Sequence, residues 1–400
     1  MVRRGGGALS GDAGPRRSGD LHRRSRQRPR LARHRPHPRA GAGAGARRGL
    51  PRRGPCGLQR YRGIGPVPSG PSRPPTRSQL PVKKIELHLH LEGAAPPDFI
   101  RSLAGEKRLT LDGVFDDRGA YAYDDFAGFL RCYEGATRVL QGPRDYARLL
   151  AEVLERCAEE GVIYVELFVS PEFCGEADLS AWRDHLAAMT EVADAARADG
   201  IDSRGIVTAI RHFDPDRARR SAICAAETAG GWITGFGMGG AEQVHKATDF
   251  AWSFDCAAEA GLGLTCHAGE WLGPDSVRQA LDLGCTRIGH GVRAIEDPAL
   301  VRDLVERNIT LEVCPGSNIA LGVYPGWDAH PIARLADAGV RVTVSTDDPP
   351  FFHSTLRAEY DRLASTFDWG DTEFRQINLW AAEAAFCDTA TRDRLKKEFA

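Results

Sequence analysis

Two histidines lie two residues apart in an alternating run at 85–93, Ile-Glu-Leu-His-Leu-His-Leu-Glu-Gly. Side chains of a β-strand alternate between its faces, so His88 and His90 are predicted to point to the same side, away from the leucines. Two imidazoles on one face are suited to binding a metal ion. A surface strand that merely carries histidines is the alternative for this run taken alone.

Three later runs end in the same way, with polar residues at a turn. They read Leu-Thr-Cys-His-Ala-Gly-Glu at 264–270, Arg-Ile-Gly-His-Gly at 287–291 and Val-Thr-Val-Ser-Thr-Asp-Asp-Pro at 342–349. Each begins as a short strand-like segment. The candidate functional residues that these runs add are His267, Glu270, His290, Asp347 and Asp348.

Eight strand-like runs alternate with helical stretches between residues 81 and 400, and a glycine follows six of the helical stretches. This alternation predicts an α/β fold, a (β/α)8 TIM barrel in one domain, with a helical insertion after the first strand. A doubly wound open sheet is the alternative, but its Gly-x-Gly-x-x-Gly turn is missing after the first strand. The expected strands are residues 84–91, 162–169, 204–210, 233–238, 262–267, 287–290, 310–314 and 341–345. The expected helices are residues 144–159, 179–198, 215–229, 250–260, 275–283, 298–307 and 331–338.

The carboxyl ends of the strands of such a barrel meet at one mouth, where active sites lie. Three histidines and one carboxylate reach this mouth, and this set of nitrogen and oxygen ligands suits zinc, with one position open to solvent. The predicted ligands of one Zn²⁺ per chain are His88, His90, His267 and Asp347. Other polar or small residues expected at strand ends of the same mouth are Gly239, Gly240, Ser317 and Asn318.

The remaining ionisable side chains of the mouth are predicted to act near the metal. Glu270 lies three residues beyond a ligand and is the candidate proton shuttle. His290 is placed to hold or deprotonate a water molecule that zinc makes more acidic. Asp348 follows a ligand directly and should point differently. It either accepts a hydrogen bond from a ring nitrogen or supports the neighbouring loop.

Five short motifs carry these residues in a fixed order along the chain. They are His-Leu-His-Leu-Glu-Gly at 88–93, His-Ala-Gly-Glu at 267–270, Gly-His-Gly at 289–291, Cys-Pro-Gly-Ser-Asn at 314–318 and Ser-Thr-Asp-Asp-Pro at 345–349. Together they resemble the adenosine deaminase family of metal-dependent hydrolases, over essentially all of residues 82–400. The resemblance implies zinc-dependent hydrolysis of adenosine or deoxyadenosine to the inosine product and ammonia.

The resemblance also implies a role for each matching residue. Glu270 would pass a proton to purine N1 and His290 would orient the water molecule. Asp348 would contact N7, and the backbone amide of Gly240 would contact N3. Zinc would lie on the same four ligands, ribose contacts are implied near Glu92, and His90 is counted among the substrate-binding residues. A helix of the first insertion would cover the sugar, and the residues with helical spacing for this cover, or for plain core packing, are Phe126, Phe129, Leu130 and Tyr133.

One segment departs from the family pattern and leaves the substrate open. The family reads roughly Asp-Leu-Ala-Gly-x-Glu after the fourth strand, whereas residues 237–242 read Gly-Met-Gly-Gly-Ala-Glu. Gly240 is retained, and its missing side chain permits close approach to a purine. Adenine and 5′-modified adenosines such as aminodeoxyfutalosine are therefore alternative substrates. The Asp-Asp-Pro-Pro-Phe-Phe run at 347–352 favours adenosine over adenine.

The first 80 residues differ in composition from the rest, with 20 arginines, no lysine and two acidic residues. Such a segment buries little apolar surface, so we expect it to be disordered and interpret it as a start codon assigned too far upstream. A nucleic-acid-binding arm or a transit peptide is the functional alternative, although its proline and glycine oppose an amphipathic helix. Residues 81–400 then hold 33 basic and 52 acidic residues, a net charge of −19. This charge indicates a soluble protein without a polyanion-binding surface.

Ten cysteines are scattered without Cys-x-x-Cys spacing, which indicates reduced thiols and a cytoplasmic protein. The same absence excludes the zinc site of cytidine-type deaminases. The sequence contains no run of 18 apolar residues, so no membrane span is predicted. The expected partner is a small purine nucleoside, with no nucleic acid and no membrane, and no oligomeric state is predicted.

Two rival functions remain on the same scaffold. A non-catalytic purine-binding protein would be indicated by a lost ligand or a lost Glu270, and neither is lost. A bimetallic amidase or phosphotriesterase would need a bridging lysine, and no lysine lies between residues 162 and 245. The histidines treated as structural are His185, His212, His245, His330 and His353.

Overall fold

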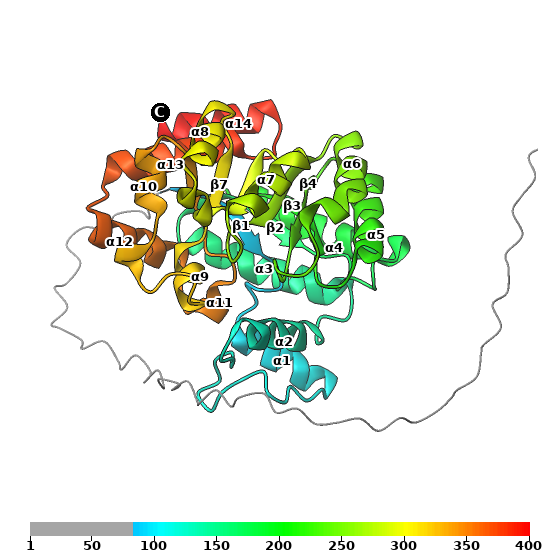
Figure 1. The fold of residues 1–400 in the computed structure, drawn as a ribbon. Coiled ribbons are helices and arrows are strands. Elements are labelled where there is room, and N and C mark those ends of the chain that lie inside the picture. Colours follow the sequence, from blue (N-terminus) through cyan, green and yellow to red (C-terminus); the bar gives the residue numbers. More distant parts are fainter. Residues whose placement is uncertain (1–82) are drawn as a thin grey trace, which may run out of the picture. The chain divides into compact units, whose positions relative to one another are not determined.

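A computed structural model describes residues 83–400, so the predicted disordered tail at 1–80 lies outside the described residues. Within them, eight parallel strands form one sheet in sequence order, β1 to β8 (Figure 1). The predicted (β/α)8 barrel is therefore confirmed. The strands are β1 Lys84–His90, β2 Val162–Val169, β3 Asp202–Ile210, β4 Ile233–Gly239, β5 Gly263–Ala268, β6 Arg287–His290, β7 Thr310–Val313 and β8 Arg341–Val344.

The first and last strands close the barrel through backbone hydrogen bonds. The amide of His90 donates to the carbonyl of Asp347 over 3.0 Å, and the amide of Asp347 donates to the carbonyl of His88 over 3.1 Å. The seam of the barrel thus runs through three of the predicted metal ligands.

Helices follow the strands and cover the outside of the barrel (Figure 1). Proline occupies the first turn of several of them, where its missing N–H costs no hydrogen bond. All seven predicted helices are present with ends shifted by at most two residues. They are α3 Pro143–Glu159, α4 Leu179–Ala198, α5 Pro215–Glu227, α6 Ala251–Glu259, α7 Pro274–Asp282, α8 Pro298–Glu306 and α10 Ile332–Asp337. Further elements are the helices α9 Pro315–Ala320, α11 Pro349–Phe352, α12 Leu356–Phe367, α13 Asp371–Ala384 and α14 Thr389–Phe399, and the 3-10 helices η1 Ala247–Phe250, η2 Val292–Glu296 and η3 Trp327–Ala329.

The insertion after β1 carries helices α1 (Pro97–Lys107) and α2 (Phe126–Thr137), drawn in cyan in Figure 1. Asp125 caps α2, because its carboxylate accepts the amide of Gly128 over 2.7 Å. One face of α2 is aromatic. Phe129 is buried against Phe351 and Phe352, which belong to α11 after β8. This packing fixes α2 over the end of the barrel where β8 finishes.

A buried ion pair network fills the barrel below its mouth. The guanidinium of Arg287 on β6 lies 2.6 Å from Glu166 of β2 and 2.6 Å from Glu312 of β7. All three side chains are fully buried, so each charge depends on its partners. No helix of the described residues is long and apolar enough to cross a membrane.

Candidate metal centre and active site

Four side chains from three separate strand ends converge at the mouth of the barrel. The Nε2 atom of His267 lies 3.0 Å from Nε2 of His88 and 3.1 Å from Nε2 of His90. Asp347 Oδ1 lies 3.4 Å from Nε2 of His88 and 3.3 Å from Nε2 of His90. The predicted ligand atoms therefore face one another. Together with His290, three of these residues hold ligand atoms within 4.8 Å of one another.

The side chains of this cluster suit a divalent cation. Imidazole nitrogens facing one another need a proton or a cation between them, because two lone pairs repel. Burial alone lowers the pKa of His88, but Asp347 and Glu312 beside its ring raise that pKa to about 9, so positive charge is favoured there. Burial and the neighbouring histidines hold the pKa of His267 well below its usual value, which leaves its lone pair available.

The backbone is strained at two positions of the cluster. His290 has φ 59° and Asp347 has φ 66°, a left-handed conformation that residues other than glycine adopt at a cost. His290 is the last residue of β6 and Asp347 lies three residues beyond the end of β8, and both side chains reach the mouth of the barrel. Strain of this kind persists only where the surrounding structure enforces it.

Two side chains that are not predicted ligands fix the orientation of the ligands, and one of them, Ser317, was expected at this mouth. Glu312 Oε2 lies 2.7 Å from Nδ1 of His88, so Nε2 of this ring is directed into the cluster. Burial would raise the pKa of Glu312, but Arg287 and His88 lower it to about 2, so the carboxylate stays charged. Ser317 donates its hydroxyl to Oδ2 of Asp347 over 2.7 Å and leaves Oδ1 facing the histidines.

Glu270 lies beside the cluster without joining it. Its Oε2 atom is 3.9 Å from Nε2 of His290. Burial, reinforced by the charges of Asp347 and Glu242, raises the pKa of Glu270 well above the usual range. This shift favours the protonated form of the carboxyl, the form in which a proton shuttle donates.

A carboxylate from the loop after β4 holds the segment that carries Glu270. Glu242 accepts the backbone amides of Gly269 over 2.6 Å, Trp271 over 2.7 Å and Leu272 over 3.0 Å. It also accepts the hydroxyl of Ser276. This role was not predicted, although the glutamate belongs to the segment compared with the family pattern.

His290 is oriented by a chain of two further side chains. The amide nitrogen of Asn318 lies 3.3 Å from Nδ1 of His290, and the amide oxygen of Asn318 lies 3.2 Å from Nε2 of His330. Because the Asn318 amide donates to it, Nδ1 of His290 is an acceptor and the proton of the neutral ring lies on Nε2, toward Asp347 and Glu270. His330, treated as structural from the sequence, is thus a positioning residue for the site.

Asp348 is buried next to the cluster, and its Oδ1 atom has no hydrogen-bond partner among the described residues. Burial and the adjacent Asp347 raise the pKa of Asp348 well above its usual range, so it can donate a proton to an acceptor in the cavity. A Cβ atom at Gly93 would lie 1.6 Å from Oδ1 of Asp348. The glycine of the first motif therefore makes room for this carboxyl.

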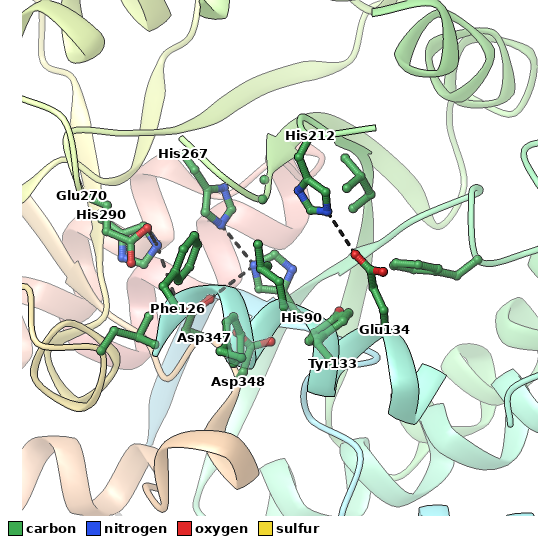
Figure 2. A pocket seen from close by; sticks show the side chains of 17 residues that line it. His90, Phe126, Tyr133, Glu134, His212, His267, Glu270, His290, Asp347 and Asp348 are labelled. Atoms are coloured by element: carbon green, nitrogen blue, oxygen red, sulfur yellow. Dashed lines mark hydrogen bonds and ion pairs between the residues drawn. The ribbon is translucent and has the colours of Figure 1, made fainter. Parts of the chain in front are cut away.

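A cavity lies in front of the cluster, bounded by the barrel mouth on one side and α2 on the other (Figure 2). Phe126 and Phe129 from α2 line it, as predicted, and Gly240 lies in its wall. Glu92 does not line it. Its carboxylate instead accepts the hydroxyls of Tyr133 and Tyr146 over 3.4 and 3.3 Å, beneath the cavity wall.

Two further polar residues of the wall were not predicted. His212, treated as structural from the sequence, follows β3 and lines the cavity together with Glu134 of α2. Nε2 of His212 lies 3.2 Å from Oε1 of Glu134 (Figure 2). Their separation of 78 residues in the chain gives no local pattern that could have paired them.

A parallel (β/α)8 barrel with a histidine and aspartate cluster at its mouth defines a metal-dependent hydrolase. The family model described as adenosine deaminase matches residues 83–400, and the chain belongs to this family. An adenine deaminase from Agrobacterium fabrum is 47% identical over 314 residues, which are 78% of this chain and 96% of the relative. One from Rhizobium johnstonii is 47% identical over 316 residues, 78% of this chain and 98% of the relative.

Two solved structures share the architecture. The crystal structure of an adenine deaminase from Arthrobacter aurescens has a TM-score of 0.73 and 28% identity, and covers 80% of this chain and 98% of its own. That of an amidohydrolase from Burkholderia ambifaria with bound zinc has a TM-score of 0.72 and 25% identity, and covers 80% of this chain and 89% of its own.

Proposed function

We propose that the protein is a zinc-dependent adenine deaminase, which converts adenine and water to hypoxanthine and ammonia. The proposal rests on the similarity to adenine deaminases, two of which are 47% identical to this chain over nearly their whole length. The proposed substrate is thus adenine, the alternative from the sequence, and not adenosine, which the run at 347–352 favoured. The free base also agrees with the position of Glu92, which lies outside the cavity where a ribose contact was expected.

The residues of the mouth divide the reaction between them. The protonated carboxyl of Glu270 donates to N1 of the purine, which makes C6 more electrophilic. His290 lies on the same side of the cavity as Glu270, and its Nε2–H holds the attacking water by donating a hydrogen bond to it. Asp348, also protonated, donates to N7. The aromatic face of α2 excludes bulk water from the ring, which strengthens each of these contacts.

One zinc ion per chain is the proposed cofactor, on His88, His90, His267 and Asp347. When bound, zinc supplies a Lewis acid that lowers the pKa of water toward ~7. The bound zinc of the Burkholderia ambifaria structure supports this choice of metal. A cytoplasmic location is part of the proposal, and the nine free cysteines of the described residues support it.

The test is a substrate profile of the purified full chain. Ammonia release is measured with adenine, adenosine, deoxyadenosine and a 5′-modified adenosine, each at several concentrations. The kcat/KM for adenine should exceed that for each nucleoside by at least ~10²-fold. A higher kcat/KM for adenosine than for adenine would restore the substrate that the sequence first favoured, and no ammonia from any of them would support the binding-protein alternative.

A further inference from the structure

Glu134 of α2 is held in a fixed orientation at the cavity wall by a chain of two hydrogen bonds. The backbone amide of Ala241 lies 3.2 Å from Nδ1 of His212 and donates to it. The neutral ring therefore carries its proton on Nε2, and it donates this proton to Oε1 of Glu134 over 3.2 Å. Within the described residues, no hydrogen bond reaches the second carboxylate oxygen of Glu134, which leaves this oxygen free to accept one.

The pair lies at the end of the cavity opposite the proton shuttle. Figure 2 shows Glu270 and His290 on one side, His267 and His90 between, and His212 with Glu134 on the other side. The cavity lining also includes Phe173, Ile210 and Tyr133, and the hydroxyl of Tyr133 donates to Glu92. The carboxylate of Glu134 is therefore the acidic acceptor at this end.

The backbone next to the pair belongs to Gly240, whose amide is expected from the family resemblance to contact purine N3. A Cβ atom at Gly240 would lie 2.5 Å from Nδ1 of His212, so the imidazole is packed directly against this glycine. In a purine, N3 and N9 are both bonded to C4. A base whose N3 faces Gly240 and whose C6 faces the cluster therefore directs N9 toward His212 and Glu134.

We infer that Glu134 is a specificity residue that accepts the N9–H of a free 6-aminopurine base, and that His212 positions its carboxylate. The inference rests on the proposed adenine deaminase function and adds the substrate class, purine bases unsubstituted at N9. A nucleoside has no hydrogen on N9 and places its sugar against Glu134. The charged carboxylate oxygen of Glu134 would then lose its hydrating water without gaining a hydrogen-bond donor. Enzymes reject analogues that lack a single N–H through a free-energy cost of this kind.

The experiment compares adenine with 9-methyladenine, which differ only at the atom in question. We expect Glu134→Ala to lower the ratio of kcat/KM for adenine to that for 9-methyladenine at least 10-fold relative to the wild type. His212→Ala should lower the ratio in the same direction, and the double variant should lower it no further than Glu134→Ala, because the ring acts through the carboxylate. Arg131→Ala changes an exposed residue of the same helix and should leave the ratio unchanged.

An inhibition measurement covers the case in which 9-methyladenine is turned over too slowly. The inhibition constants of hypoxanthine and 9-methylhypoxanthine then give the same ratio. If Glu134→Ala weakens both ligands equally, the residue only holds α2 in place and the inference is overturned. Wild-type enzyme without activity on adenine would instead contradict the proposed function, so the two failures can be told apart.

Discussion

His88 and Asp347 are bonded to each other twice, once through the backbone and once through their side chains. The amide of Asp347 donates to the carbonyl of His88 over 3.1 Å, and Nε2 of His88 lies 3.4 Å from Oδ1 of Asp347. The first contact closes the barrel between β8 and β1, and the second belongs to the metal cluster. Closure of the sheet and assembly of the centre are therefore the same structural event.

Removal of the metal should accordingly lower the stability of the whole barrel. An ion that binds the folded chain and not the unfolded one stabilises the fold by mass action. We expect a chelator to lower the melting temperature by several degrees and about one equivalent of Zn²⁺ to restore it. Asp347→Ala should show the low value with or without chelator, whereas the exposed His353→Ala should behave as the wild type. Two ions per chain in metal analysis would contradict a mononuclear site.

Loss of Glu270 should separate proton transfer from metal binding. Glu270→Gln keeps the size of the side chain but removes the acidic proton. We expect kcat for adenine to fall at least ~10²-fold, the usual scale for general acid–base help, while the zinc content stays at the wild-type level. Zinc loss in this variant, measured by elemental analysis, would place the side chain among the metal ligands instead.

Glu242→Gln should lower turnover although its side chain does not touch the substrate. The amide NH2 of glutamine would face one of the donors that the carboxylate now accepts, so the loop at Gly269 and Trp271 would shift. We expect a ~10-fold lower kcat with unchanged zinc content. Combined with Glu270→Gln, the loss should be less than the product of the single losses, because both changes act on one proton transfer. Fully multiplicative losses would refute this coupling.

Asp348 is proposed to contact N7 of the purine, and a substrate that lacks this nitrogen can test the contact. With 7-deazaadenine the acceptor nitrogen is replaced by carbon. If both changes break the same bond, Asp348→Ala should lower kcat/KM for adenine but have little further effect on 7-deazaadenine. Additive losses would mean that Asp348 acts elsewhere, for example by holding the loop after β8.

Glu359 should make the protein less stable as the pH rises. Burial raises the pKa of this carboxyl to about 7 from the ordinary 4.5, against the opposing hydrogen bonds from Ser354 and Gly316. Between these two values the folded state binds more protons than the unfolded state, so the free energy of unfolding falls by about 1.4 kcal/mol per unit of pKa difference. Glu359→Gln should remove this decline between pH 5 and 8 in urea unfolding. Parallel profiles for variant and wild type would contradict the shift.

The strands and the metal cluster could be predicted because their signals are local. His88 and His90 alternate with leucines, and His267 near the end of β5 and Asp347 after β8 each follow a short strand-like run. Such a pattern fixes both the secondary structure and the end of the barrel at which a side chain appears. The predicted strand ends differ from the observed ones by no more than two residues.

The supporting residues could not be predicted, because their partners are distant in the chain. Glu312 lies in the run Thr-Leu-Glu-Val, which reads as an ordinary strand, and its partner His88 is 224 residues away. Glu134 occupies a helix position that would normally face solvent, and only the closed barrel brings His212 to it. The sequence left adenosine and adenine open as substrates for the same reason, since the residues at the far end of the cavity carry no motif.

Arg287 links the metal centre to the end of α13 and the segment that follows it. It contacts Glu312, which orients His88, and it donates to the carbonyl of Ala384 over 3.1 Å. The ring of Phe386 lies over its guanidinium at 3.7 Å. A change in the segment at Ala384 and Phe386 would therefore reach the predicted ligand His88 through Arg287 and Glu312.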